Sequence, residues 1–184
     1  IEKENIASEI EALALLSRVD VQMEEAGTRV VYLSYLYHCE QYIAKRLCSL
    51  RSEQYTLDEK NFEISLRQFA SVTGCALNED QTKAVRIAGE NGVTVITGGP
   101  GTGKTTIIRA LVSFLSSCNK SCLLAAPTGR AAKRMTEACG IQAKTIHRLL
   151  EFSGDDADDD TELTFKRDER NPIEADVLII DELS

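Results

Sequence analysis

The chain has 184 residues, which is enough for one well-packed domain, or for one domain and a smaller appendage. It contains no run of about 18 apolar residues, and its N-terminal stretch IEKENIASEIEALALL is acidic and amphipathic, which argues against a transmembrane span and a secretory signal. The six cysteines form no CxxC pair, and with only two histidines they disfavour a zinc site. They are typical of reduced thiols, so we expect a cytoplasmic protein without a membrane partner.

The charge is distributed unevenly along the chain. The formal net charge is −8, yet Lys120 to Arg148 holds six basic residues against one acid, whereas Leu149 to the end holds thirteen acids against three bases. Contacts with phosphate act within about one Debye length, roughly 10 Å, so local charge matters more than the sum. The basic segment therefore remains a candidate for a nucleic-acid contact.

The first part of the sequence predicts a small unit of helices around a β-hairpin. Apolar residues at helical spacing predict a helix over residues 5–17, and VDVQMEEAGTRVVYL predicts two short strands around a turn at residues 25–27. Two more helices follow, and the later one closes near Gly74. We expect residues 1–75 to form a mostly helical domain with a β-hairpin, whose helix, hairpin, helix order would suit a winged-helix remnant. The apolar face of its second helix holds Leu36, Cys39, Ile43, Leu47 and Leu50.

From residue 77 onward, short apolar runs alternate with helical patterns. A helix over 78–90 leads to a strand at Val93–Thr97, and a further helix precedes a strand in SCLLAA. A helix over 129–138, a helical stretch in TIHRLLEF, an acidic surface loop SGDDADDDTE and a strand in DVLIID complete the chain. This alternation indicates an α/β fold with a parallel sheet flanked by helices. The helix after the first strand carries the apolar residues Ile108, Leu111, Val112 and Leu115.

The stretch GGPGTGKT lies between the predicted strand at Val93–Thr97 and the following helix, and it matches the phosphate-binding pattern G-x-x-x-x-G-K-[ST] in full. Glycines allow the backbone to turn so that its N–H groups point at phosphate oxygens at a helix N-terminus. Lys104 would bring a positive charge to the β and γ phosphates, and Thr105 would offer a hydroxyl to Mg²⁺. The pattern therefore predicts a nucleoside triphosphate site.

The last strand of the sequence ends in two acids, Asp181 and Glu182. In P-loop folds a neighbouring strand ends in an Asp that holds the magnesium ion, and Asp181 has that position. Glu182 is placed to orient and deprotonate an attacking water, which favours hydrolysis over transfer to another substrate. Taken alone, the pair could be an ordinary strand-end turn. With the P-loop upstream, we predict that Lys104, Asp181 and Glu182 are the catalytic residues.

Gln81, in LNEDQTKA, has two interpretations from the local sequence. It is the N3 residue of a capping box that begins at Asn78, which is a purely structural role. Alternatively, its amide recognises the N6 and N7 edge of adenine, since the donor and acceptor of the amide match that edge. The local pattern leaves both interpretations open.

Five stretches in this order and spacing resemble the RecD family of superfamily 1 DNA helicases: LNEDQTKAV, ITGGPGTGKTT, AAPTGRAAKRM, AKTIHRLL and DVLIIDELS. That family includes the alpha subunit of exodeoxyribonuclease V and stand-alone relatives, and the resemblance covers about residues 77–184. It implies a P-loop NTPase (RecA-like) lobe over residues 76–184, ATP with Mg²⁺, and 5′ to 3′ movement on single-stranded DNA in recombination and repair. It also implies nuclease and helicase partner subunits as one form of the parent assembly.

The resemblance also implies roles for individual residues. It favours Gln81 as the adenine contact, and it places ATP on Gly98, Gly99, Pro100, Gly101, Thr102, Gly103, Lys104, Thr105 and Thr106, with Mg²⁺ on Thr105 and Asp181. It places DNA on Pro127, Thr128, Gly129, Arg130, Lys133, Thr145 and His147. Thr128 could also cap the following helix, and the basic residues could form an ordinary solvated helix face. Leu183 departs from the family, in which a small residue often follows the Asp-Glu pair.

Family members need a second lobe that supplies an arginine to the ATP site. The resemblance therefore implies that this chain is a fragment, truncated after the magnesium-binding Asp181, and we expect it to bind nucleotide weakly and barely hydrolyse it. Two other classes of protein remain open. One is another P-loop enzyme, such as a relaxase-linked helicase or a small-molecule kinase, and the other is a DNA-binding module that ATP regulates without unwinding.

Overall fold

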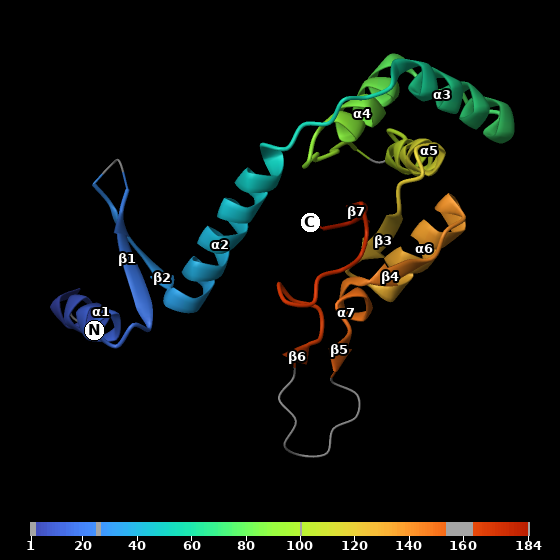
Figure 1. Cartoon of the computed structure of the whole chain (residues 1–184). Helices are drawn as coiled ribbons and strands as arrows, with labels where there is room; N and C mark the ends of the chain where they lie inside the picture. The colour runs from blue at the N-terminus through green and yellow to red at the C-terminus, as the bar shows by residue number, and fades with distance from the viewer. Residues whose placement is uncertain (1–2, 25–26, 100, 154–163, 184) are drawn as a thin grey trace. The chain divides into compact units, whose positions relative to one another are not determined.

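The computed structural model describes residues 3–24, 27–99, 101–153 and 164–183 of the chain (Figure 1). Its internal contacts divide the chain into two compact units, Ile1–Gln54 and Tyr55–Ser184. The sequence analysis places the division after residue 75 instead. The difference arises because the helix between the two positions packs its aromatic side chains into the core of the second unit, as described below.

The first unit contains the expected helix–hairpin–helix order: α1 (Lys3–Leu15), β1 (Val19–Met23), β2 (Arg29–Leu33) and α2 (Ser34–Arg51). The two strands pair antiparallel over their full length, with Val21 opposite Val31. Gly27 lies in the left-handed region at φ +77°, which suits glycine in the turn, and the rest of the predicted turn lies outside the described residues. The secondary structure predicted for this part of the chain is thereby confirmed.

The predicted apolar face of α2 forms, but its side chains remain largely exposed within the first unit. Leu36, Ile43, Leu47 and Leu50 all keep between 46% and 58% of their surface accessible. Among the described residues of this unit, only Ser34 at the start of α2 is buried. The unit therefore has little core of its own.

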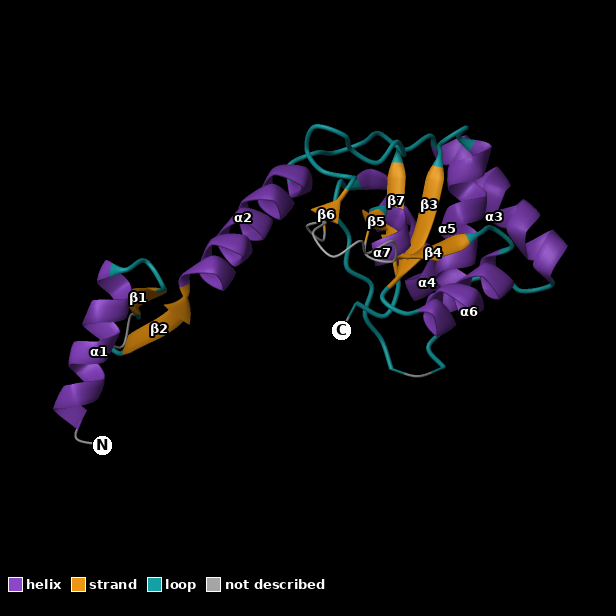
Figure 2. Ribbon diagram, turned by 90° about the horizontal axis from the view of Figure 1, so that it is seen from below, coloured by secondary structure: helices purple, strands orange, loops and turns teal. Residues whose placement is uncertain are grey.

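The second unit begins with three helices: α3 (Glu59–Thr73), α4 (Glu79–Glu90) and α5 (Lys104–Ser117). It continues with β3 (Cys122–Ala126), α6 (Gly129–Cys139), β4 (Ala143–Thr145) and α7 (Ile146–Leu149). A small antiparallel pair, β5 (Phe152–Ser153) and β6 (Thr164–Phe165), precedes the last strand, β7 (Val177–Ile180). Strands β4, β3 and β7 form a parallel sheet in that order, with β3 in the middle (Figure 2).

Helix α5 is the central element of the core. One face packs against α3 and α4, where Phe62, Phe69 and Val85 are buried, and the rings of Phe62 and Phe114 meet edge to face at 5.2 Å. Another face of α5 packs Ile108 and Val112 against Leu124 of β3 and Met135 of α6. The four apolar residues predicted for the core face of this helix, Ile108, Leu111, Val112 and Leu115, are all buried. This covering of the sheet confirms the predicted α/β class with flanking helices.

Hydrogen bonds of Asp176 join the start of β7 to the start of β3. Its carboxylate accepts hydrogen bonds from the Ser121 backbone N–H at 2.8 Å, from Ser121 Oγ at 2.7 Å and from Lys120 Nζ at 3.0 Å. The bonds from Ser121, and then the bond from Lys120, lower the pKa of Asp176 to about 2. The backbone N–H of Asp176 donates back to Ser121 Oγ at 2.8 Å, so the two strand ends hold each other in register.

The strand predicted at Val93–Thr97 does not form, and that prediction is wrong. The alternation of β-branched residues in VTVIT favours a strand, but a strand also needs a neighbour for its backbone N–H and C=O groups. Among the described residues the sheet ends at β7, and none of its strands pairs with 93–97. Val95 accordingly keeps 80% of its surface exposed.

The stretch TIHRLLEF is helical only in part. Thr145 ends β4, the helix α7 covers Ile146–Leu149 alone, and Phe152 already belongs to β5. The sequence analysis predicted neither β4 nor the β5–β6 pair, which consist of two or three residues per strand. Most of the predicted acidic loop lies outside the described residues. Among the helices that the structure describes, none has the length and apolar character needed to cross a lipid bilayer.

Candidate functional site

The glycine-rich loop leads into the first turn of α5. Gly101 at φ +77° and Gly103 at φ +88° lie in the left-handed region, which residues with a Cβ adopt only with strain. A Cβ on Gly98 would lie 2.6 Å from Thr102 Oγ1, and that hydroxyl donates to the Gly99 carbonyl oxygen at 2.9 Å. The loop is therefore compact and depends on its glycines. Pro100 lies outside the described residues.

Lys104 is the first residue of α5, and its side chain bends back over the loop. Its Nζ donates to the carbonyl oxygens of Gly98 at 2.6 Å and Gly99 at 3.0 Å. Thr105 and Thr106 follow in the first turn of the helix, where Thr105 is exposed and Thr106 half-buried. A helix N-terminus with an adjacent ammonium group and hydroxyls is suited to binding an anion.

Asp181 lies directly after β7, and the pairing of β7 with β3 continues to it, since its backbone N–H donates to the Ala125 carbonyl oxygen at 3.0 Å. Asp181 and Lys104 line the same pocket, of about 190 Å³, between α5, β7 and the segment that follows α4. Glu182 is exposed and lies at φ +57°, and its N–H donates to Asp181 Oδ1 at 3.0 Å. The structure thus brings together the loop and the acidic strand end, which are far apart in the sequence.

Gln81 occupies the N3 position of α4, and both halves of the capping box are present. Its N–H donates to Asn78 Oδ1 at 2.8 Å, and its Oε1 accepts from the Asn78 N–H at 3.1 Å. The structural interpretation of Gln81 is therefore confirmed. Its Nε2 also donates to the Thr102 carbonyl oxygen at 3.4 Å, a contact with the glycine-rich loop that the sequence analysis missed.

The segments predicted to contact DNA meet at one edge of the sheet. Thr128 follows β3 and caps α6, with its side chain accepting from the Ala131 N–H at 3.2 Å. Thr145 ends β4 opposite Ala126 and caps α7, accepting from the Arg148 N–H at 3.2 Å. Because these strands are parallel, both caps lie at the same carboxyl edge as Asp181. The capping role of Thr128 is confirmed.

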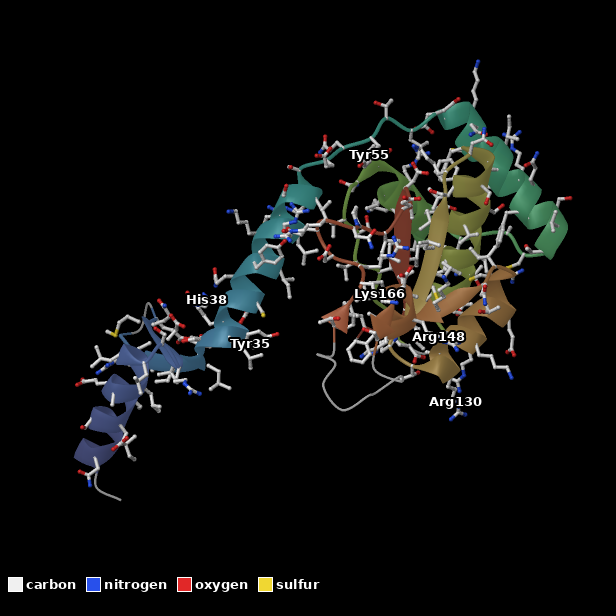
Figure 3. The ribbon with its side chains drawn as sticks, turned by 60° about the horizontal axis from the view of Figure 1, so that its bottom comes forward. Tyr35, His38, Tyr55, Arg130, Arg148 and Lys166 are labelled. Carbon is white, nitrogen blue, oxygen red and sulfur yellow. The ribbon has the colours of Figure 1, made fainter. Side chains whose placement is uncertain are left out.

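The remaining residues of these two segments are mostly solvent-exposed. Pro127, Gly129, Arg130 and Lys133 are exposed, and Lys133 lies 3.9 Å from Glu137 in an exposed pair of the kind that contributes little to stability. In Figure 3, Arg130, Arg148 and Lys166 all lie on the lower part of the second unit. Two of these cations, Arg130 and Arg148, belong to the two helices that Thr128 and Thr145 cap.

His147 belongs to a cluster of aromatic rings that the sequence analysis did not foresee. Its ring centroid lies 5.5 Å from that of Phe152 and 6.1 Å from that of Phe165, and the two phenylalanines are 4.9 Å apart. Phe152 and Phe165 are also paired across β5 and β6. No local sequence signal joins them, because twelve residues separate them and the strands that pair them have two residues each.

Comparison with known families gives one match, to the model described as AAA domain, over residues 81–184. That range is more than half of the chain and includes the glycine-rich loop, the helices α6 and α7 and Asp181. The chain belongs to the AAA domain family. As a member of it, the chain has a P-loop NTPase fold and a nucleotide-binding site, which confirms the predicted fold class.

Several curated proteins are similar to this member of the AAA domain family. The "ATP-dependent RecD2 DNA helicase" of Deinococcus radiodurans is 36% identical over 108 residues, which are 59% of this chain and 14% of that protein. The "RecBCD enzyme subunit RecD" of Mycolicibacterium smegmatis is 36% identical over 129 residues, covering 58% and 22%. The protein of the same name from Haemophilus influenzae is 31% identical over 172 residues, covering 80% and 26%.

These similarities support the RecD-like helicase family that the five sequence stretches indicated, so the suspected resemblance is confirmed. The chain spans between about a seventh and a quarter of the length of these three relatives.

Proposed function

We propose that this chain is the ATP-binding lobe of a RecD-like, ATP-dependent DNA helicase that moves 5′ to 3′ on single-stranded DNA in recombination and repair. One observation carries the proposal: the carboxyl edge of a single sheet holds Asp181, which shares a pocket with Lys104, and separately a basic edge with the exposed cations Arg130 and Lys133. Lys104 and Asp181 line the pocket, and Thr128 and Thr145 cap the two helices at the ends of β3 and β4. A motor needs such a pair of sites on one rigid element.

The glycine-rich loop, the first turn of α5 and Asp181 fit a magnesium–ATP complex. The N–H groups of the loop and of the first turn of α5 would bind the phosphates, and Lys104 would exchange its bonds to Gly98 and Gly99 for bonds to phosphate oxygens. The Thr105 hydroxyl and the Asp181 carboxylate are oxygen ligands of the kind that Mg²⁺ prefers. Bound there, the ion would neutralise charge on the phosphates.

Hydrolysis needs a water molecule oriented toward the γ-phosphate and a group that accepts its proton. We assign this role to Glu182, which follows the proposed magnesium ligand directly. Its backbone N–H donates to Asp181 Oδ1, which holds the Asp181 carboxylate against the Glu182 backbone, while the Glu182 side chain remains exposed. Gln81 would contact the adenine edge with its side-chain amide when ATP is bound.

The basic edge supports a contact with the DNA backbone. Helix α6 begins at Gly129, after Pro127 and the cap Thr128, and its first backbone N–H groups form the positive end of a helix of eleven residues. Arg130 and Lys133 add exposed cations on that helix, with Thr145 and His147 on the neighbouring segment. Contacts of this type hold the strand without reading its sequence.

We further propose that the parent protein is cytoplasmic and acts either alone or with nuclease and helicase partner subunits. The two kinds of relative support these alternatives, since one is named as a helicase in its own right and others are named as a subunit of the RecBCD enzyme. All six cysteines are free, which suits a reducing compartment.

Strand displacement by the full-length protein tests the proposal. Duplexes with a 5′ or a 3′ single-stranded tail are incubated with ATP and Mg²⁺, and the Lys104→Ala variant serves as the inactive control. Unwinding of the 5′-tailed duplex alone, absent from the variant, is the expected result. Binding of DNA that responds to ATP without any strand displacement would instead favour a regulated DNA clamp.

A further inference from the structure

The Gln81 side chain uses both ends of its amide within the protein. Oε1 accepts from the Asn78 N–H, and Nε2 donates to the Thr102 carbonyl oxygen at 3.4 Å. The first bond completes the cap of α4, whereas the second reaches a loop 21 residues further along the chain. Capping therefore accounts for only one of the two bonds.

The loop is also shaped to accommodate this amide. A Cβ on Gly103 would lie 2.3 Å from Gln81 Nε2, so any side chain at position 103 would displace the amide. Gly103 lies at φ +88° and immediately precedes Lys104, the first residue of α5. The close approach and the hydrogen bond are separate observations, and both place the Gln81 amide against the junction between the loop and the helix.

The other side-chain bonds of the described loop residues and of Lys104, which follows the loop, stay within the loop or join it to the first turn of α5. Thr102 Oγ1 and Lys104 Nζ both donate to carbonyl oxygens of Gly98 or Gly99. Such bonds hold the shape of the loop and fix it to the helix that follows it in sequence. Gln81 fixes it to a second element, α4, which is anchored in the core by the fully buried Val85.

We propose that Gln81 is a positioning residue for the phosphate-binding loop: its amide ties Thr102 and Gly103 to the start of α4 and so holds the loop in the shape that receives phosphate. This proposal rests on the nucleotide site proposed above, but not on recognition of the base. Adenine would need the same donor and acceptor of the amide. Anchoring of the loop and reading of the base are therefore alternative uses of one side chain, exchanged when ATP binds.

Amide hydrogen exchange of the ligand-free 184-residue chain tests the anchor directly. Gln81→Glu keeps an acceptor for the Asn78 N–H, and hence the capping box, but loses the donor to Thr102. Gln81→Ala loses both bonds, and Asn78→Ala weakens the cap while leaving the donor in place. We expect exchange at the Thr102 and Ile107 amides to rise about three- to tenfold in both Gln81 variants, as for the loss of one hydrogen bond, and to stay near wild type in Asn78→Ala.

Binding of magnesium tripolyphosphate is the second measurement, because this ligand has the phosphates of ATP and no base. Gln81→Ala should weaken it about three- to tenfold, and Asn78→Ala should not. Unchanged exchange in both Gln81 variants would overturn the proposal, as would an equal effect of Asn78→Ala, which would reduce Gln81 to a helix cap. If the wild-type chain fails to bind ATP, the proposed nucleotide site fails, while the exchange result still decides whether Gln81 anchors the loop.

Discussion

Thr128 and Thr145 cap two helices that start side by side, because Thr145 is paired with Ala126, the last residue of β3 and two residues before Thr128. The parallel register alone produces this proximity between segments that are 17 residues apart in sequence. Parallel strands end at one edge of a sheet, and segments that leave this edge share a surface. The start of α6, which carries Arg130, therefore shares this surface with the start of α7.

Removal of a single cation from α6 should lower the affinity for single-stranded DNA. It should also make that affinity less dependent on salt concentration. Arg130→Ala and Lys133→Ala are each expected to lower the slope of log affinity against log salt by about 0.7 to 1, since each would remove one phosphate contact. The affinity should fall by a similar factor for oligonucleotides of different sequence. The measurement is fluorescence anisotropy with labelled oligonucleotides at several salt concentrations.

Arg67→Ala is the matched control for those variants. Arg67 is an exposed cation on α3, paired with Glu63 at 3.0 Å, and it does not belong to the helices α6 and α7. Its removal changes the net charge by the same amount and should leave the salt dependence unchanged. An equal reduction in all three variants would show that overall charge, rather than the α6 surface, governs DNA binding.

Substitution of the loop lysine should abolish most of the nucleotide affinity. Lys104→Met removes the ammonium group that now bonds the Gly98 and Gly99 carbonyl oxygens, and with it a charged partner for the phosphates. A hydrogen bond to a charged group contributes about 1.5–3 kcal/mol, so ATP affinity should fall at least about tenfold. Calorimetric titration of ATP with Mg²⁺ measures the change. Lys60→Met on the exposed start of α3 is the control, and an equal loss there would contradict the role of Lys104.

Gln81 should also determine the choice of base if its amide contacts adenine. We expect the wild-type chain to prefer ATP over GTP by about tenfold or more, and Gln81→Ala to lose that preference, as expected for a paired donor and acceptor. Asn78→Ala, which removes the other half of the capping box, should keep it. If the wild type binds both nucleotides with equal affinity, Gln81 does not recognise the base. That result would leave its proposed contact with Thr102 untouched.

Much of the second unit could be predicted from the sequence because its signals are local. The four core residues of α5 recur at helical spacing, and the loop pattern fixes its own backbone through glycine and the helix that follows. The capping box of Asn78 and Gln81 could be predicted for the same reason, since both partners lie within one turn. These features depend on residues that are neighbours in sequence.

The features that escaped prediction depend on long-range pairing. The residues of Val93–Thr97 have the alternation of a strand, yet their structure depends on whether another strand lies beside them, which the local pattern does not contain. The contact between Gln81 and Thr102 and the ring pair of Phe152 and Phe165 arise only when the chain folds back on itself. Asp176 is a further case, because nothing in its local sequence indicates a bond to Ser121.

The bonds of Asp176 should make the stability of the second unit depend on pH in a defined direction. The pKa of this carboxyl is about 2 in the folded chain, below its ordinary value of 3.8, because Ser121 and Lys120 donate to the charged form. A depressed folded pKa gives stability that is fully present above the unfolded value and is lost as the pH falls through the folded value. The contribution should therefore be complete near neutral pH and decline between about pH 4 and pH 2.

Asp176→Asn tests this expectation in thermal unfolding followed at a series of pH values. The variant should unfold at a lower temperature than the wild type at pH 7, and the difference should shrink toward pH 2, where the wild-type carboxyl also becomes neutral. Glu174→Gln is the control. Glu174 is an exposed acid two residues earlier on the same segment, and its substitution removes the same charge. If the difference between Asp176→Asn and the wild type stays constant down to pH 2, ionisation of Asp176 does not stabilise the pairing of β7 with β3.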